Sequence, residues 1–309
     1  MTAPNPAASV VQFLCTPFGA AGAGPGNGIW TFDLWITAPL MLSLVLYGIG
    51  TFALWRRAGW RRGVRTRQVG CYAAGWLMLG VALVSPIHHW GNELFAVHMV
   101  EHELVMAVAA PLIALAQPGW ALPWALPAAA RRVVGSVMQR YWLRAGWAAL
   151  TRPGAATILH GVAIWAWHIP VLFEAAVVSV ALHRLQHLSF LVTGLLFWCA
   201  LVRCRNSGVA AAHLFATMLH TSILGALIAL APRVLYRLQT EGAAAWGLTP
   251  LQDQQLAGLI MWIPAGGIYA GAALLFFAAW VRQSGAAARV RATGVTPFAS
   301  HGECRGAAD

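Results

Sequence analysis

Seven long apolar stretches constrain this chain more than any other feature of its sequence. Each comes close to the roughly 20 apolar residues that an α-helix needs to cross a bilayer. They lie at residues 30–55, 68–86, 95–117, 155–173, 183–202, 210–232 and 256–281. Only 9% of the 309 residues are charged, too few to cover a soluble domain of this length. The sequence therefore predicts an all-α polytopic membrane protein with seven transmembrane helices, because open sheets do not span lipid and barrel-strand alternation is absent.

The positions of the arginines predict how these helices are oriented. All 20 basic residues are arginine, and seventeen of them fall in loops or a tail that seven helices would place on one side. Only Arg184, Arg233 and Arg237 fall on the other side. Positively charged loops stay in the cytoplasm, so we expect the N-terminus outside and the C-terminus inside a bacterial inner (plasma) membrane. The net charge of +11 then indicates anionic membrane lipids as partners, and no nucleic acid.

The chain is expected to have one folded domain between two tails. Residues 1–29 lack the basic start of a signal peptide and predict a flexible periplasmic tail. Residues 30–282 form the transmembrane domain, and residues 283–309 predict a disordered cytoplasmic tail. Within the domain, the cytoplasmic loop 118–154 mixes arginine with Trp, Val and Met, which predicts a helix lying in the membrane interface.

Histidines gather at the predicted outer ends of the helices. Seven of the eleven lie there: His88, His89, His98, His102, His168, His183 and His187. The others are His160, His213, His220 and His301, and a single membrane histidine more often hydrogen-bonds a neighbouring helix. Ionisable residues are costly in a membrane, so the outer set indicates a functional site.

Two histidine pairs have the spacing of metal ligands on a helix. His98/His102 and His183/His187 are four residues apart, which puts each pair on one helix face about 5–6 Å apart. Met106 is four residues after His102 and lies on the same predicted helix face, one turn further into the membrane. Imidazole with thioether is a plausible set for copper, while zinc accepts imidazoles and haem takes two from facing helices. We therefore predict a site for a metal ion or a haem.

Several other polar or soft side chains are auxiliary candidates at this site. Glu101 and Glu103 flank His102, where they could orient its imidazole or accept protons, or simply face solvent. Asp253 and Met261 lie at the start of the seventh helix, where Asp253 could orient an imidazole or cap its own helix. A single methionine is more often a packing residue. His88 and His89 are equally well explained by interfacial solvation.

Known catalytic motifs are absent from the sequence. There is no GxSxG, P-loop or GxGxxG in a suitable setting, and the HEL at 102–104 does not continue to HExxH. The five cysteines contain no CxxC pair. These catalytic chemistries therefore find little support in the sequence.

Four ordered blocks resemble the multi-spanning CtaG-type cytochrome c oxidase assembly factors. They are HMVEHELVMAVAAPLIALAQP (98–118), WHIPVLFEAA (167–176), HRLQHLSFLVTGLLFW (183–198) and LTPLQDQQLAGLIMWIPAGGIY (248–269). The resemblance covers roughly residues 85–280 and carries the family pattern onto His98, His102, His168, His183, His187, Asp253 and Met261. The chain departs from that pattern at Glu101, Gln186 and Ala110, where Gln, Glu and Pro are expected.

The resemblance implies a role in copper-centre maturation of a haem–copper oxidase. Its partners would be an oxidase subunit and a periplasmic copper carrier, and copper would pass on by ligand exchange without turnover. A copper transporter, a haem-binding membrane redox protein and a purely structural scaffold remain alternatives. A transporter needs ligands at several depths, which His213 and His220 could supply. A haem would need ligands from two helices, such as His102 and His187.

Overall fold

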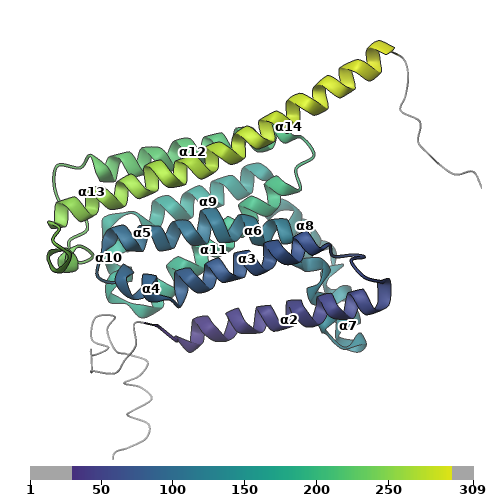
Figure 1. Ribbon diagram of the computed structural model, residues 1–309, viewed down its shortest axis with the longest axis horizontal. Coiled ribbons are helices and arrows are strands. Elements are labelled where there is room, and N and C mark those ends of the chain that lie inside the picture. The colour runs from purple at the N-terminus through teal and green to yellow at the C-terminus, as the bar shows by residue number, and fades with distance from the viewer. Residues whose placement is uncertain (1–29, 294–309) are drawn as a thin grey trace, which may run out of the picture.

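The chain folds into a bundle of helices, and the computed structural model describes residues 30–293 (Figure 1). Five helical spans are long and apolar enough to cross a membrane, or six if a bent pair is counted as one span. The prediction of an all-helical, multi-pass membrane protein is confirmed at this level. The predicted number of seven is not reached by this criterion.

The five spans agree with five of the predicted stretches. Two are single helices in the second half of the bundle, α11 (Val180–Val202) and α12 (Ser207–Ala229), and α2 (Leu34–Ala58) is the first. The span Phe95–Trp120 consists of α5 (Phe95–Glu103), the π-helix η1 (Leu104–Ala109), α6 (Ala110–Ala116) and η2 (Pro118–Trp120). The span Pro250–Gly285 consists of α13 (Pro250–Ile260), the π-helix η5 (Met261–Ala265) and the first part of α14 (Gly266–Thr293).

The two remaining stretches differ from the prediction. The stretch 155–173 is not one straight helix: α9 (Pro153–Trp167) and α10 (Pro170–Val178) meet at 73°. Ile169 is extended and Pro170 begins the new helix, as expected for a residue that precedes proline.

The stretch 68–86 forms α3 (Thr66–Leu83), whose polar first turn contains Arg67 and Gln68. His88 and His89 lie in a separate short helix, α4 (Pro86–Gly91), instead of ending α3.

The long loop 118–154 contains several short helices. They are η2 (Pro118–Trp120), η3 (Leu122–Ala125), α7 (Ala128–Met138) and α8 (Tyr141–Leu150). Neither α7 nor α8 has a buried residue, although both carry Trp, Val or Met beside arginine. This is the composition of helices that lie along an interface. The remaining short helix, η4 (Glu241–Trp246), lies in the loop before α13.

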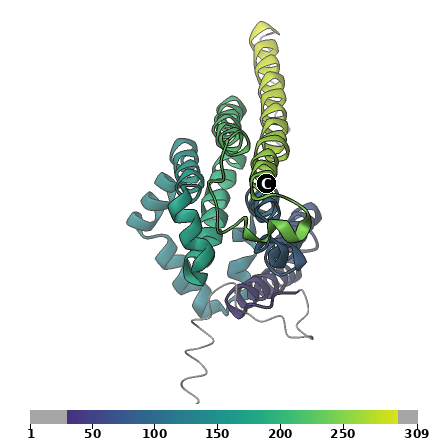
Figure 2. The same ribbon diagram turned by 90° about the vertical axis from the view of Figure 1, so that its left-hand side faces the viewer.

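The two ends of the bundle differ in chemistry. The α4 helix, α10 and the start of α5 lie together at one end, on the left in Figure 1. The arginine-rich C-terminal end of α2, with α7 and α8, lies at the other end. Figure 2 faces the first end and shows α14 extending beyond the other helices. We call the first end, defined by α4, the start of α5 and α10, the histidine end.

The helix α14 continues to Thr293, into the segment from Gln283 that was expected to be disordered. The expectation for 1–29 and for the rest of the tail falls outside the described residues.

Candidate metal site

Three buried imidazoles meet at the histidine end. His98 and His102 stand on one face of α5, with ring centroids 4.2 Å apart, and His187 comes from α11. The ring centroid of His187 lies 5.0 Å from that of His102 and 5.9 Å from that of His98. One ligand atom from each of the three lies within 4.8 Å of the others. The arrangement can hold a metal ion between two helices.

The nitrogens of this group have few partners in the protein. Neither ring nitrogen of His98 or His102 has a hydrogen-bond partner among the described residues, nor does Nδ1 of His187. Both histidines are only 1% exposed, and buried polar atoms are normally hydrogen-bonded because an unpaired one costs about 1–3 kcal/mol. Unpaired imidazole nitrogens pointing into a shared space fit a cation that would bind them. We name this set, His98, His102 and His187, the three-histidine group.

A second set of potential ligands adjoins it. His88 on α4, Glu101 on α5 and His183 on α11 have ligand atoms within 4.8 Å of one another and are all buried. Nδ1 of His88 lies 2.7 Å from Oε1 of Glu101. Burial alone would lower the pKa of His88, but the Glu101 carboxylate and this hydrogen bond leave it raised. We name this set, His88, Glu101 and His183, the His–Glu group.

The two groups lie directly beside each other. Nε2 of His187 lies 2.9 Å from Nε2 of His183 and 3.5 Å from Oε1 of Glu101. The four paired histidines expected from the sequence therefore do come together.

His168 lies at the margin of this cluster. Its ring centroid is 6.4 Å from that of His102, and it ends α9 at the bend before α10. Nδ1 donates to the carbonyl of Ile164 at 2.6 Å, which leaves Nε2 as the acceptor nitrogen, buried and without a hydrogen-bond partner in the described part of the chain. Metal-binding histidines commonly use one ring nitrogen in this way. The hydroxyl of Tyr236 donates to the His168 carbonyl at 2.7 Å and holds the bend.

The sequence suggested that Asp253 orients an imidazole, but its hydrogen bonds within residues 30–293 go to the backbone of α5. Its two carboxylate oxygens accept from the backbone N–H groups of Phe95 and Ala96 at 2.8 and 2.9 Å. These are orphan donors at the N-terminus of α5, where a negative charge is also favourable. Nor does Asp253 cap its own helix, because Thr249 and Gln252 form the capping box of α13. Asp253 thus positions the helix that carries His98 and His102.

Both predicted methionines lie in a hydrophobic cluster. Met106 and Met261 pack with residues such as Phe95 and Phe190. The prediction put Met106 on the same helix face as His98 and His102 and assumed regular α-helical spacing. The π-helix η1 begins between His102 and Met106, and its wider turn changes the angular position of Met106 around the helix. The carbonyl of Met106 accepts from Nε1 of Trp198 at 3.0 Å. No short motif in the sequence marks this π-helix.

Two further predicted residues lie outside the cluster. His89 has a side chain that is 44% exposed and pairs with Glu93 at 3.5 Å. Glu103 is buried, and its Oε2 has no hydrogen-bond partner among the described residues. Glu103 belongs to neither ligand group.

The deeper histidines contact other side chains. His160 lies 3.1 Å from the Thr193 hydroxyl and 3.5 Å from the Tyr269 hydroxyl. His213 lies 3.1 Å from the Thr157 hydroxyl. Nδ1 of His220 accepts from Nε1 of Trp165 at 3.3 Å. Within residues 30–293, both ligand groups of three or more therefore lie at the histidine end.

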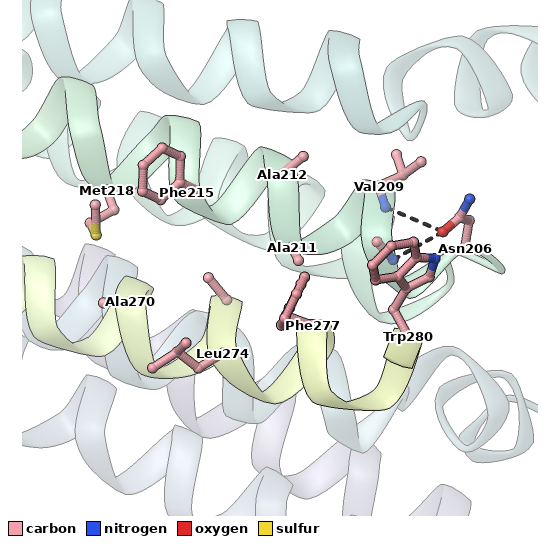
Figure 3. A pocket seen from close by; sticks show the side chains of 12 residues that line it. Asn206, Val209, Ala211, Ala212, Phe215, Met218, Ala270, Leu274, Phe277 and Trp280 are labelled. Atoms are coloured by element: carbon pink, nitrogen blue, oxygen red, sulfur yellow. Dashed lines mark hydrogen bonds between the residues drawn. The ribbon is translucent and has the colours of Figure 1, made fainter. Parts of the chain in front are cut away.

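A large surface groove lies elsewhere, between α12 and α14, with a volume of about 690 Å³ (Figure 3). Phe215 of α12 and Phe277 and Trp280 of α14 line it, and Asn206 caps α12 at its edge. Its lining is almost entirely apolar and contains no histidine or carboxylate. A groove of this kind on membrane-spanning helices suits lipid acyl chains and offers no metal site.

Comparison with known proteins identifies the family. No curated protein and no solved structure matches the chain. The family model described as cytochrome c oxidase caa3 assembly factor matches residues 45–283, which is well over half of the chain and includes both ligand groups. The chain therefore belongs to the cytochrome c oxidase caa3 assembly factor family.

Proposed function

We propose that this protein binds copper at the histidine end and helps to mature the copper centre of a haem–copper oxidase in the bacterial inner (plasma) membrane. The single observation that carries the proposal is the three-histidine group, whose buried ring nitrogens are largely unpaired. Membership of an oxidase assembly family implies association with the oxidase. Copper is then the cargo that connects such a site to a haem–copper oxidase.

The family, together with the ligand set, favours copper as the cargo. Imidazole suits copper, zinc and iron, so the nitrogen ligands alone do not choose among them. Zinc also accepts such nitrogens but has no role in a haem–copper oxidase that the family would explain. Copper delivery needs only exchange of ligands between donor, cluster and client. Under this proposal the protein performs no catalytic turnover.

Close packing argues against a haem between α5 and α11. His102 and His187 are the cross-helix pair that could ligate iron from opposite faces. Their ring centroids are only 5.0 Å apart, and the Phe190 ring centroid lies 4.8 Å from that of His102. The ring centroid of His98 is also only 4.2 Å from that of His102. A porphyrin would have to displace these rings.

Copper transport across the whole membrane is less well supported. A transport path needs ligand sets at successive depths. The deeper histidines His160, His213 and His220 instead contact hydroxyl and indole groups, as described above. Both sets of three ligands in the described chain lie at one end.

We further propose that α3 crosses the membrane as a seventh span, and that the histidine end faces the periplasm. The arginines at the opposite end support this orientation through the positive-inside rule. A periplasmic copper carrier would then reach the cluster directly. A fluorescent protein fused after the C-terminal tail should fold and fluoresce in the cytoplasm; an active periplasmic phosphatase fusion at that position would contradict the orientation.

Oxidase maturation in cells is the direct test of the proposed function. In a strain lacking this protein, we expect the wild-type chain to restore oxidase copper content and oxygen consumption, and His98→Ala/His102→Ala to fail. His89→Ala is the matched control, because this exposed histidine lies outside both groups. Full oxidase maturation by the double variant, at equal membrane levels, would rule out the three-histidine group as the working site.

A further inference from the structure

The His–Glu group has its own set of ligand atoms. His88 and His183 each offer an imidazole nitrogen, and Glu101 offers a carboxylate oxygen. The three come from α4, α11 and α5, so three separate helices converge on this position. None of them is among the residues assigned above to the three-histidine group.

The carboxylate of Glu101 is the unusual member. It is fully buried, and its Oε2 has no hydrogen-bond partner among the described residues. Oε2 is 4.0 Å from Nδ1 of His98, while Oε1 contacts His88 at 2.7 Å and His187 at 3.5 Å. Burying an ionised carboxylate is expensive unless a positive charge compensates for it. A cation beside Glu101 would provide that compensation.

The two groups adjoin each other. His183 and His187, one from each group, have Nε2 atoms 2.9 Å apart. In known two-metal sites the ions lie about 3.5–4 Å apart. Two cations this close repel each other, and a negative charge shared by their ligand sets reduces that repulsion. The Glu101 carboxylate can serve both sets, because its Oε1 lies 2.7 Å from His88 of one group and 3.5 Å from His187 of the other.

We propose that the cluster holds two metal ions side by side, one on the three-histidine group and one on the His–Glu group. The inference rests on the proposed copper-binding function and adds the number of ions and the role of Glu101. The second position lies toward α4, which carries His88.

Counting bound copper(I) tests this inference. The full chain, purified in detergent, is loaded anaerobically with copper(I), passed over a weak chelator and measured by elemental analysis. We expect two copper ions per chain in the wild type and about one in Glu101→Gln, which keeps the side-chain shape and removes the charge. His183→Ala should also retain about one, and His89→Ala should match the wild type.

The outcomes separate this inference from the proposed function. One copper in the wild type, unchanged in Glu101→Gln and His183→Ala, would overturn the second position and leave the copper function standing. Complete loss in a folded Glu101→Gln protein, with a wild-type thermal transition, would show a single centre that includes Glu101 and would also overturn the pair. No copper in the wild type would reject the proposed function itself.

Discussion

At the scale of single residues, Glu101 links the parts of the cluster. Its carboxylate contacts His88 of α4 and lies near His187 of α11, while its own helix carries His98 and His102. One buried negative charge thus lies among imidazoles from three helices. A neutral cluster of histidines would have much less attraction for a cation. The charge makes this end of the bundle suited to a positively charged cargo.

The paired histidines could be predicted because their spacing is local. A separation of four residues on a helix puts His98 over His102 and His183 over His187 whatever the rest of the fold does. The partners of Asp253 could not be predicted in this way, since Phe95 and Ala96 lie more than 150 residues away in the chain. The sequence contained no sign that its carboxylate would meet those two backbone N–H groups.

Replacing Asp253 tests its role as the anchor of α5. Asp253→Ala removes both acceptors from the Phe95 and Ala96 N–H groups. Hydrogen bonds to a charged group contribute about 1.5–3 kcal/mol each, so we expect a loss of roughly 3 kcal/mol. Thermal unfolding in detergent should show a midpoint at least about 5 °C lower than in the wild type.

The matched control for this change is Asp33→Asn. Asp33 pairs with Arg184 at 2.6 Å, but both side chains are partly exposed. Such pairs contribute about 0–1 kcal/mol, so the transition should move little. An Asp253→Ala protein as stable as Asp33→Asn would contradict the anchoring role.

At the scale of elements, irregular segments occur beside the cluster. The π-helices η1 and η5 interrupt two of the spans, and Pro264 lies inside η5. A π-helix accommodates an extra residue within a helix and often occurs near functional sites. The bend between α9 and α10 places His168 beside the other imidazoles. The apolar stretches predict spans from length and hydropathy, which do not register such local changes.

Close packing of α12 on α13 supports the helix that carries Asp253. Gly225 and Gly258 face the opposing backbone, and a Cβ atom on Gly258 would lie 2.4 Å from the nitrogen of Ala229. Gly258→Ala would force the two helices apart, so we expect it to lower the thermal midpoint and weaken copper retention. Overpacking of this kind typically costs about 1–3 kcal/mol.

Gly271→Ala is the matched control for the packing of α12 on α13. A Cβ atom there has no neighbour within 4 Å, and alanine is the better helix former by about 1 kcal/mol. The control should be as stable as the wild type or slightly more so. Equal midpoints for Gly258→Ala and Gly271→Ala would show that the close approach contributes nothing.

At the scale of the whole molecule, basic and histidine-rich ends are separated by the length of the bundle. The arginine-rich end of α2 lies at one end, and α4, which carries His88 and His89, lies at the other (Figure 1). This separation was predictable, because loop charge and helix order assign each loop to a side. The number of spans was harder to predict, because α3 begins with Thr66, Arg67 and Gln68. This polar turn lowers the mean hydropathy of α3.

The central claim is that the three-histidine group binds copper, and elemental analysis of the purified protein tests it most directly. Wild type and His98→Ala/His102→Ala are loaded with copper(I) without oxygen and compared at equal concentration after removal of loose metal. We expect copper on the wild-type chain and the loss of at least one copper per chain in the double variant. A wild-type protein that retains no copper, or a folded double variant that retains as much as the wild type, would contradict it.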